Sequence, residues 1–374
     1  MFVHRRWRAW GHRAVLALAI SLGGGAAPLL AAMPDVYEVA GVAVDVTAET
    51  AAKARDTAIG EGHAKAFRQL LARLTLKADR SRLPELTVNG IAAYVTDFSV
   101  ANEKTSATRY LASLTFRFKR EAIRRLLTDY HLPFAETPSK PVLVLPVFEE
   151  AGAVLLWDTP NPWRTAWEET PAPDGLVPLA LPLGDLSDIA AIGAEQAARG
   201  DAQRLAAIAS RYGAGDSLVA HAIKTVEARA NTIRIDVSTT RYGPTGGGQT
   251  LVRAYASAAG ETTEALLRRA AAEIAVEVED DWKRDNLLQF GRPGVIAVTI
   301  PIGALSEWLA IRDRMAGMAV IRSTDVVFLS RTEVRANLQF VGTTEQLTLA
   351  LAQADLALTQ EGAAWVLRSL RKGS

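Results

Sequence analysis

The chain has 374 residues, 49% of them hydrophobic, and a formal net charge of +1 at pH 7. This hydrophobic content supplies material for packed cores and excludes an intrinsically disordered chain. The length predicts two or three domains. The chain contains no cysteine, which excludes disulfide bonds, thiol catalysis, thiolate metal sites and lipid attachment to cysteine.

Residues 1–32 have the composition of a secretory signal peptide. An arginine-rich start is followed by an uncharged apolar stretch over residues 14–30, which ends at Ala31 and Ala32. These are the three parts of a cleavable signal, so we expect export to the periplasm. The alternative is an inner-membrane anchor formed by an uncleaved N-terminal helix, but the three glycines and the proline in this stretch suit a membrane helix poorly.

Removal of this leader would change the charge of the protein. The leader carries four arginines and no acidic residue, so the rest of the chain holds 38 basic and 41 acidic residues, a net charge of −3. A mildly acidic protein offers no electrostatic attraction for nucleic acid or anionic lipid. We therefore expect no nucleic-acid partner and no stable membrane insertion after cleavage.

Three α+β modules are predicted after the leader, at residues 33–135, 138–290 and 293–371. The first should have the order β-α-α-β-β-α. Its clearest evidence lies in residues 110–118, where Tyr110, Ala112, Leu114, Phe116 and Phe118 alternate with polar residues. This alternation predicts a strand in a sheet with one solvated face.

The second module begins after a proline-spaced linker with the uninterrupted apolar run 142–147. Such a run is typical of a strand that is buried on both faces. The predicted order is β-α-β-α-β-β-β-α, a mixed α/β sandwich. Its later elements include a strand at 176–183, a helical stretch at 186–212 and a closing helix at 263–288.

The third module is predicted to have the order β-α-β-β-α-β, which is that of a ferredoxin-like unit. Thr343 and Gln346 form a capping-box pattern that should open its second helix. A last strand is expected around Trp365 and Leu367.

Motifs for known chemistry are missing from the sequence. There is no H-E-x-x-H pattern, calcium loop, G-x-S-x-G elbow or phosphate loop. His63, His131 and His221 are far apart in the chain, and His221 lies in an apolar strand that favours a core role. We therefore expect no metal, no cofactor and no catalytic residue, and we interpret the acidic run from Glu277 to Asp281 as a solvated helix face.

One segment, residues 157–167, is a candidate binding site. It holds three of the six tryptophans that remain after the leader. The candidate binding residues combine aromatic faces with polar groups, a set that suits a glycan, a peptide or a partner's aromatic anchor: Trp157, Asp158, Asn161, Trp163, Arg164 and Trp167. The alternative is that these tryptophans pack as a lid over their own module.

The chain resembles an uncharacterised family of exported proteobacterial proteins, domain of unknown function number two thousand and sixty-six. The resemblance covers most of the chain after the leader and rests on these segments: VYEVAGV at 36–42, the helix with Ala54, Arg55 and Ala58, YVTDF at 94–98, PVLVLP at 141–146 and NPWR at 161–164. It implies an envelope location and no established activity. The first two modules are also similar to domains of periplasmic assembly factors, a likeness of fold alone.

These observations favour a non-enzymatic periplasmic protein that acts as an interaction or assembly factor, with envelope proteins as partners. The alternative is a binding protein for an envelope glycan or peptide that uses residues 157–167. A hydrolase with an unrecognised carboxylate pair is the third hypothesis.

Overall fold

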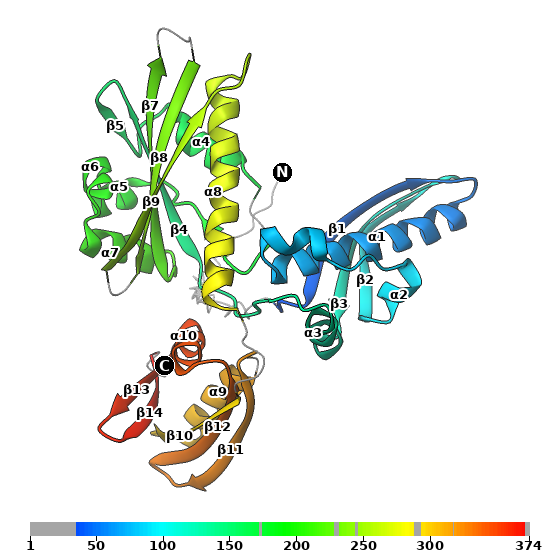
Figure 1. Ribbon diagram of the computed structural model, residues 1–374, viewed down its shortest axis with the longest axis vertical. Coiled ribbons are helices and arrows are strands. Elements are labelled where there is room, and N and C mark those ends of the chain that lie inside the picture. The colour runs from blue at the N-terminus through cyan, green and yellow to red at the C-terminus, as the bar shows by residue number, and fades with distance from the viewer. Residues whose placement is uncertain are drawn as a thin grey trace, which may run out of the picture. The chain divides into compact units, whose positions relative to one another are not determined.

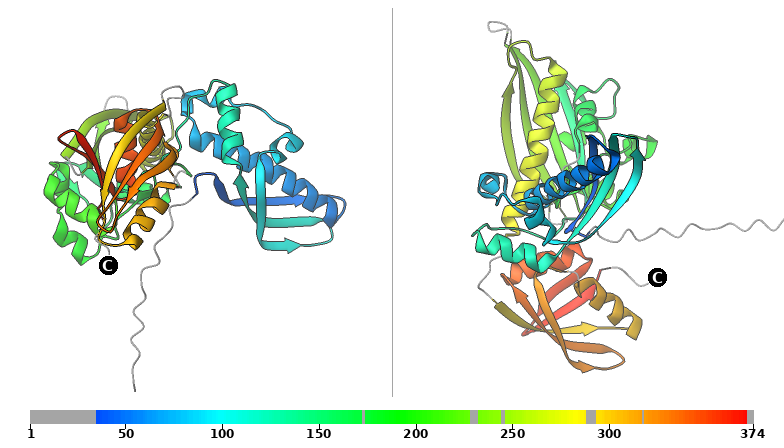
Figure 2. Two further views of the ribbon diagram at one scale, coloured as in Figure 1. Left: turned by 90° about the horizontal axis from the view of Figure 1, so that it is seen from below. Right: turned by 90° about the vertical axis from the view of Figure 1, so that its right-hand side faces the viewer.

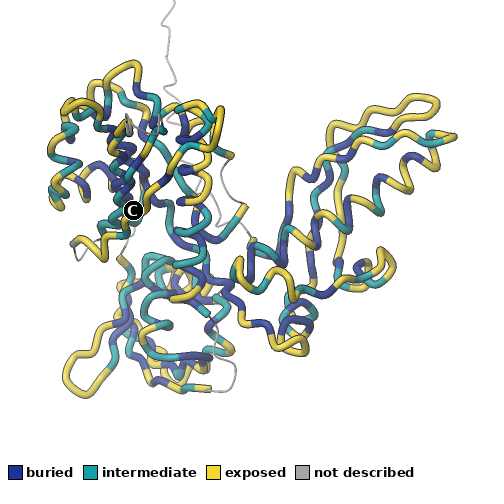
Figure 3. Tube along the Cα trace, turned by 45° about the horizontal axis from the view of Figure 1, so that its top comes forward, coloured by how far each residue is buried: buried dark blue, intermediate teal, exposed yellow. Residues whose placement is uncertain are grey.

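The structure is a computed structural model that describes residues 35–171, 174–227, 232–243, 246–287, 293–316 and 318–370. These residues form a mixed α and β fold with three sheets and eleven helices (Figure 1), which confirms the predicted α+β class. The predicted leader lies outside the described residues. Buried residues follow the strands and the inner helix faces, and exposed ones gather at the hairpin tips (Figure 3).

The first sheet is antiparallel, with the order β1-β3-β2. Its elements are β1 (Glu38–Thr47), α1 (Ala51–Leu74), the 3-10 helix η1 (Lys77–Arg82), α2 (Val88–Ala92), β2 (Val95–Thr105), β3 (Arg109–Phe118) and α3 (Arg120–Asp129). The alternating side chains of β3 face α1 and are buried. Gly62 of α1 is needed for this contact, because a Cβ there would lie 2.6 Å from Leu114 Cδ1.

The second sheet has the order β5-β4-β7-β8-β9, with β6 also paired to β4. Its elements are β4 (Val142–Glu150), β5 (Ala153–Leu155), α4 (Pro162–Glu169), β6 (Leu179–Ala180), α5 (Leu186–Ala191), α6 (Ala194–Ala198), α7 (Ala202–Arg211), β7 (Asp216–Glu227), β8 (Thr232–Gly243), β9 (Gly246–Ala256) and α8 (Thr263–Asp285). Strand β4 is buried on both faces. Helices α4 and α8 cover one face of this sheet, and α5 to α7 cover the other (Figures 1 and 2).

Two predicted elements of this segment are shorter than expected. The strand predicted at 176–183 is only β6, because Pro178 and Pro182 flank it and cannot donate to the sheet. The helical stretch predicted at 186–212 is three helices. Gly193 caps the start of α6, and Gly200, with φ +73°, follows its end.

The third sheet has the order β11-β12-β10-β14-β13. Its elements are β10 (Pro293–Pro301), α9 (Leu305–Ala316), β11 (Ile321–Leu329), β12 (Glu333–Val341), α10 (Thr344–Gln353), β13 (Leu356–Glu361) and β14 (Ala364–Ser369). The predicted order β-α-β-β-α-β lacks β13. Asp355, with φ +58°, ends the helical region early, and Gly362 turns the chain into a hairpin. The additional strand β13 reverses the chain once more, so β14 lies parallel to β10. A single last strand was predicted at this place.

A buried ion pair on α8 joins segments that are far apart in the chain. Lys283 Nζ lies 3.4 Å from Glu279 Oε1 and donates to the carbonyls of Ala72 and Thr75 at the end of α1. Glu279 accepts from the backbone N–H groups of Leu176 and Val177 at 2.7 and 2.9 Å. Burial lowers the pKa of Lys283, and the charge of Glu279 opposes this effect.

Removal of this amine should destabilise the protein strongly. Lys283→Met would leave a buried carboxylate without its cation and two carbonyls without a donor, so we expect a loss of about 3–5 kcal/mol in the free energy of unfolding. Urea denaturation at pH 7 measures it. The control Arg284→Met removes the exposed partner of Asp281 and should cost about 0–1 kcal/mol. Equal losses in the two variants would contradict this role of Lys283.

Candidate functional site

The predicted binding segment forms the start of α4 and the loop before it. Asn161 caps the helix, since its side-chain oxygen accepts from the backbone N–H groups of Trp163 and Arg164 at 3.1 and 3.0 Å. Pro162 occupies the first helical turn, where its missing N–H costs nothing. The structure thus brings Asn161, Trp163, Arg164 and Trp167 together on one helix, whereas Asp158 lies exposed in the loop.

The tryptophans of this segment pack into the protein. Trp163 is fully buried and its Nε1 donates to the carbonyl of Ala220 on β7 at 2.9 Å. Trp167 is also buried and meets Trp163 edge to face, with ring centroids 5.6 Å apart. Trp157 is half-buried and donates to the carbonyl of Ile192 at 2.7 Å. This arrangement is the one expected of a segment that packs on its own sheet.

Arg164 fixes a neighbouring loop. Its guanidinium donates to the carbonyls of Pro182 and Leu183 at 2.8 and 3.1 Å and pairs with Glu168 at 2.9 Å. All of these contacts are within the chain. Arg164 therefore holds the backbone of Pro182 and Leu183 in place, and its guanidinium is occupied by these contacts.

Substitution of Trp163 tests the packing role. Trp163→Ala would leave a cavity and deprive the Ala220 carbonyl of its donor, so we expect a loss of about 3–5 kcal/mol in the free energy of unfolding. Thermal and urea denaturation measure the loss. Trp157→Ala, at a half-buried position, should cost less. A stable Trp163→Ala protein that no longer binds an envelope partner would instead support the binding role.

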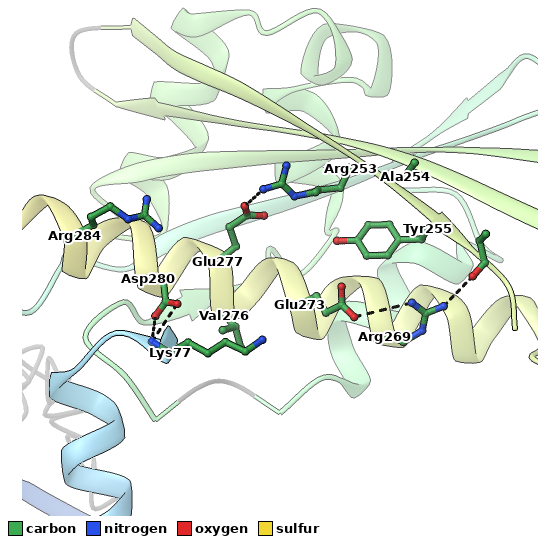
Figure 4. Close-up of a pocket in the computed structure, with 11 residues that line it drawn as sticks. Lys77, Arg253, Ala254, Tyr255, Arg269, Glu273, Val276, Glu277, Asp280 and Arg284 are labelled. Atoms are coloured by element: carbon green, nitrogen blue, oxygen red, sulfur yellow. Dashed lines mark hydrogen bonds and ion pairs between the residues drawn. The ribbon is translucent and has the colours of Figure 1, made fainter. Parts of the chain in front are cut away.

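A second candidate site lies along the outer side of α8, next to the end of β9 (Figure 4). The cleft has a volume of about 480 Å³. Its lining comes from β9, α8 and one residue of η1: Arg253, Ala254, Tyr255, Ala256, Arg269, Glu273, Val276, Glu277, Asp280, Arg284 and Lys77. We call this cleft the α8 groove. Four of its residues are basic and three are acidic, and charged groups therefore dominate its surface.

Ion pairs organise the two ends of the α8 groove. Arg253 on β9 pairs with Glu277 on α8. Arg269 pairs with Glu261 at 2.9 Å and lies 4.0 Å from Glu273. The hydrogen bond from Arg269, together with one from the Ala258 N–H, lowers the pKa of Glu261 to about 2. The Glu261 carboxylate is therefore ionised at neutral pH, and these pairs place charges of both signs along the groove.

Tyr255 lies between these pairs, with its ring over α8 (Figure 4). Burial, and then the negative charges of Glu273 and Glu277, raise the pKa of Tyr255 to about 12. The hydroxyl is therefore protonated at neutral pH and can donate a hydrogen bond. The groove thus offers one neutral donor among paired charges.

The sequence interpretation of α8 as a solvated acidic face was wrong for one residue. Glu279 was assigned to the solvated face, but it is buried together with Lys283. Glu277 and Asp280 of the same run line the groove, as does Arg284. The sequence did contain a signal for this face. Charged residues recur every three or four positions from Arg269 onward, and this spacing places them on one side of a helix.

The remaining expectations from the sequence concern His221, metal ions and membrane helices. His221 Nε2 lies 3.1 Å from Glu149 Oε2 on the neighbouring strand β4. Among the described residues, no group of three metal-ligating side chains could hold an ion. Within the same residues, no helix has both the length and the apolar character needed to cross a membrane.

Comparison with known proteins gives one match. The family model of a domain of unknown function, DUF8605, matches residues 35–136. No curated protein and no solved structure matches the chain. The match covers the first sheet and its helices, and confirms that the chain contains a domain of an uncharacterised family.

Proposed function

We propose that the chain is a non-enzymatic interaction or assembly factor of the cell envelope, exported by residues 1–32 and built from three α+β modules at 33–135, 138–290 and 293–371. The charged, glycine-interrupted N-terminal stretch supports export to the periplasm. We also propose that the chain is related to the exported family that its sequence resembles. The α8 groove is the observation that carries the interaction role.

The chemistry of the α8 groove favours a charged segment of a partner protein. Pockets for small molecules are mostly apolar and enclosed, whereas this groove is lined by seven charged side chains. The Arg253 and Glu277 side chains are 52% and 26% exposed. A charged group of a partner can therefore replace one member of this pair at little cost in desolvation. Fixed charges of both signs select a partner by complementarity and accelerate its association.

The edge strand β9 adds a second means of recognition. It is the last strand of its sheet, so one side of its backbone has no neighbouring strand among the described residues. An extended segment placed along β9 could pair with this backbone while its side chains meet the groove. An envelope protein with an extended, mixed-charge segment is the partner that fits both features.

The alternative, a glycan or peptide bound by residues 157–167, has weaker support. Trp163 and Trp167 would have to leave the core before a ligand could stack on them. Trp157 and Asp158 alone offer a small surface. The hydrolase hypothesis has no observation in its favour among the groove residues, because the Arg253 and Arg269 guanidiniums engage the carboxylates of Glu277, Glu261 and Glu273.

Charge reversal in the groove tests the interaction role. Arg253→Glu should lower cross-linked capture of the envelope partner in intact cells about tenfold or more, because like charges then meet at the binding surface. Arg253→Glu/Glu277→Arg restores the internal pair and should still fail to bind, which separates binding from stability. Arg368→Glu breaks a similarly exposed pair on the third sheet and should bind normally. Normal capture by both groove variants would refute the proposal.

The export proposal has its own test. The full chain should be recovered from the periplasmic fraction at a mass reduced by that of the leader, because a signal peptidase removes it. A chain that starts at Met33 should remain in the cytoplasm. Recovery of the full-length mass in the inner-membrane fraction would favour the uncleaved anchor instead.

A further inference from the structure

Asn89 and Gly90 form the one Asn-Gly pair in the sequence. Asparagine is a thermolabile residue, and a following glycine favours its breakdown. Glycine has no side chain to hinder its own backbone nitrogen when that nitrogen attacks the asparagine amide. The other asparagines precede larger residues, and Asn161 precedes a proline, which has no N–H. The sequence therefore marks Asn89 as the asparagine most prone to lose its amide group.

The structure leaves both reacting groups of this pair accessible. Asn89 is exposed in the first turn of α2, and within the described residues its side chain has no hydrogen-bond partner. The first N–H groups of a helix have no partner inside the helix. The Gly90 N–H donates instead to Thr87 Oγ1, at a distance of 3.3 Å that is long for such a bond. One weak hydrogen bond therefore holds the nitrogen that would attack.

The shortness of α2 allows the helix to open. Ring closure between Asn89 and Gly90 requires Asn89 to leave its helical ψ, so the reaction proceeds only while α2 is open. The helix has five residues, of which Ile91 alone is buried. A single helical turn is not stable by itself, and glycine lowers the helix propensity further. Segments with so few buried contacts open locally without unfolding the rest of a protein.

We propose that Asn89 is a site of spontaneous deamidation in the folded protein. The Gly90 backbone nitrogen loses its proton to hydroxide and attacks Asn89 Cγ. A bond forms between this nitrogen and Cγ, the Cγ–Nδ2 bond breaks, and the amide nitrogen leaves as ammonia after taking a proton from water. Water then opens the resulting succinimide ring. Cleavage of the N–Cγ bond gives aspartate, and cleavage of the original peptide bond gives isoaspartate. This inference is independent of the α8 groove.

The two products have different effects on α2. Aspartate places a negative charge in the first turn of the helix, where the helix dipole stabilises it, so α2 is kept. Isoaspartate carries the side-chain methylene into the main chain and lengthens the backbone at residue 89. The hydrogen bond from the Ile91 N–H to the Thr87 carbonyl, 2.9 Å long, spans this residue. The isoaspartate form should therefore lose this bond and the helical turn that it closes.

Peptide mapping by mass spectrometry tests the proposal, after incubation of the purified protein in mildly alkaline buffer. The Asn89 peptide should gain the mass difference between an amide NH₂ and a hydroxyl. Its conversion should be about tenfold or more faster than that of Asn102, because glycine hinders the attack less than a larger residue does. Asn102 is also exposed but precedes Glu103. The control Gly90→Ala should keep its amide. A Cβ at Gly90 would lie 3.4 Å from Thr87 Oγ1, an ordinary contact, so this variant should fold.

A second variant tests whether the opening of α2 controls the rate. Thr87→Val removes the acceptor of the Gly90 N–H and the cap of α2 with little change in shape, so conversion of Asn89 should be several-fold faster. The chain unfolded in urea should also convert, which shows that the assay detects the reaction. Conversion in urea with an intact amide in the folded protein overturns the proposal. Equal rates in the wild type and Gly90→Ala, or no acceleration in Thr87→Val, overturn it as well.

Discussion

The structure depends on backbone groups at element ends that are satisfied by charged side chains from distant segments. Lys283 supplies donors to the carbonyls of Ala72 and Thr75 at the end of α1, and such terminal carbonyls have no partner within their own helix. Glu279 accepts from two N–H groups of the 176–177 segment. Burial of this ion pair is costly by itself. The pair is tolerated because it satisfies four backbone groups that would otherwise be buried without partners.

The same principle explains the segment that the sequence marked as a binding site. Asn161 satisfies the first N–H groups of α4, and the Trp163 indole satisfies the Ala220 carbonyl. Arg164 satisfies two carbonyls of the loop before α5. Aromatic and polar residues gathered in a short stretch are typical both of ligand sites and of such internal supports. Composition cannot separate the two, because the difference is the direction in which each side chain points.

Periodicity therefore predicted the elements better than it predicted their ends and contacts. The alternation in β3, the apolar run in β4 and the capping box at Thr343 all occur as expected, since each depends on neighbouring residues. Strand β13 was missed because its start is set by the positive φ of Asp355. The α8 groove was missed because it needs β9 and α8 together, and a helical spacing alone does not tell which charged residues, such as Glu279, turn inward.

Association through the α8 groove should respond to salt. Ions screen exposed charges beyond about 8 Å at physiological ionic strength, and association through the α8 groove relies on charges of this kind. Binding that is lost in high salt would therefore be assigned to the groove. Binding that persists in high salt cannot arise from the groove, because its seven charged side chains leave little apolar surface to drive binding.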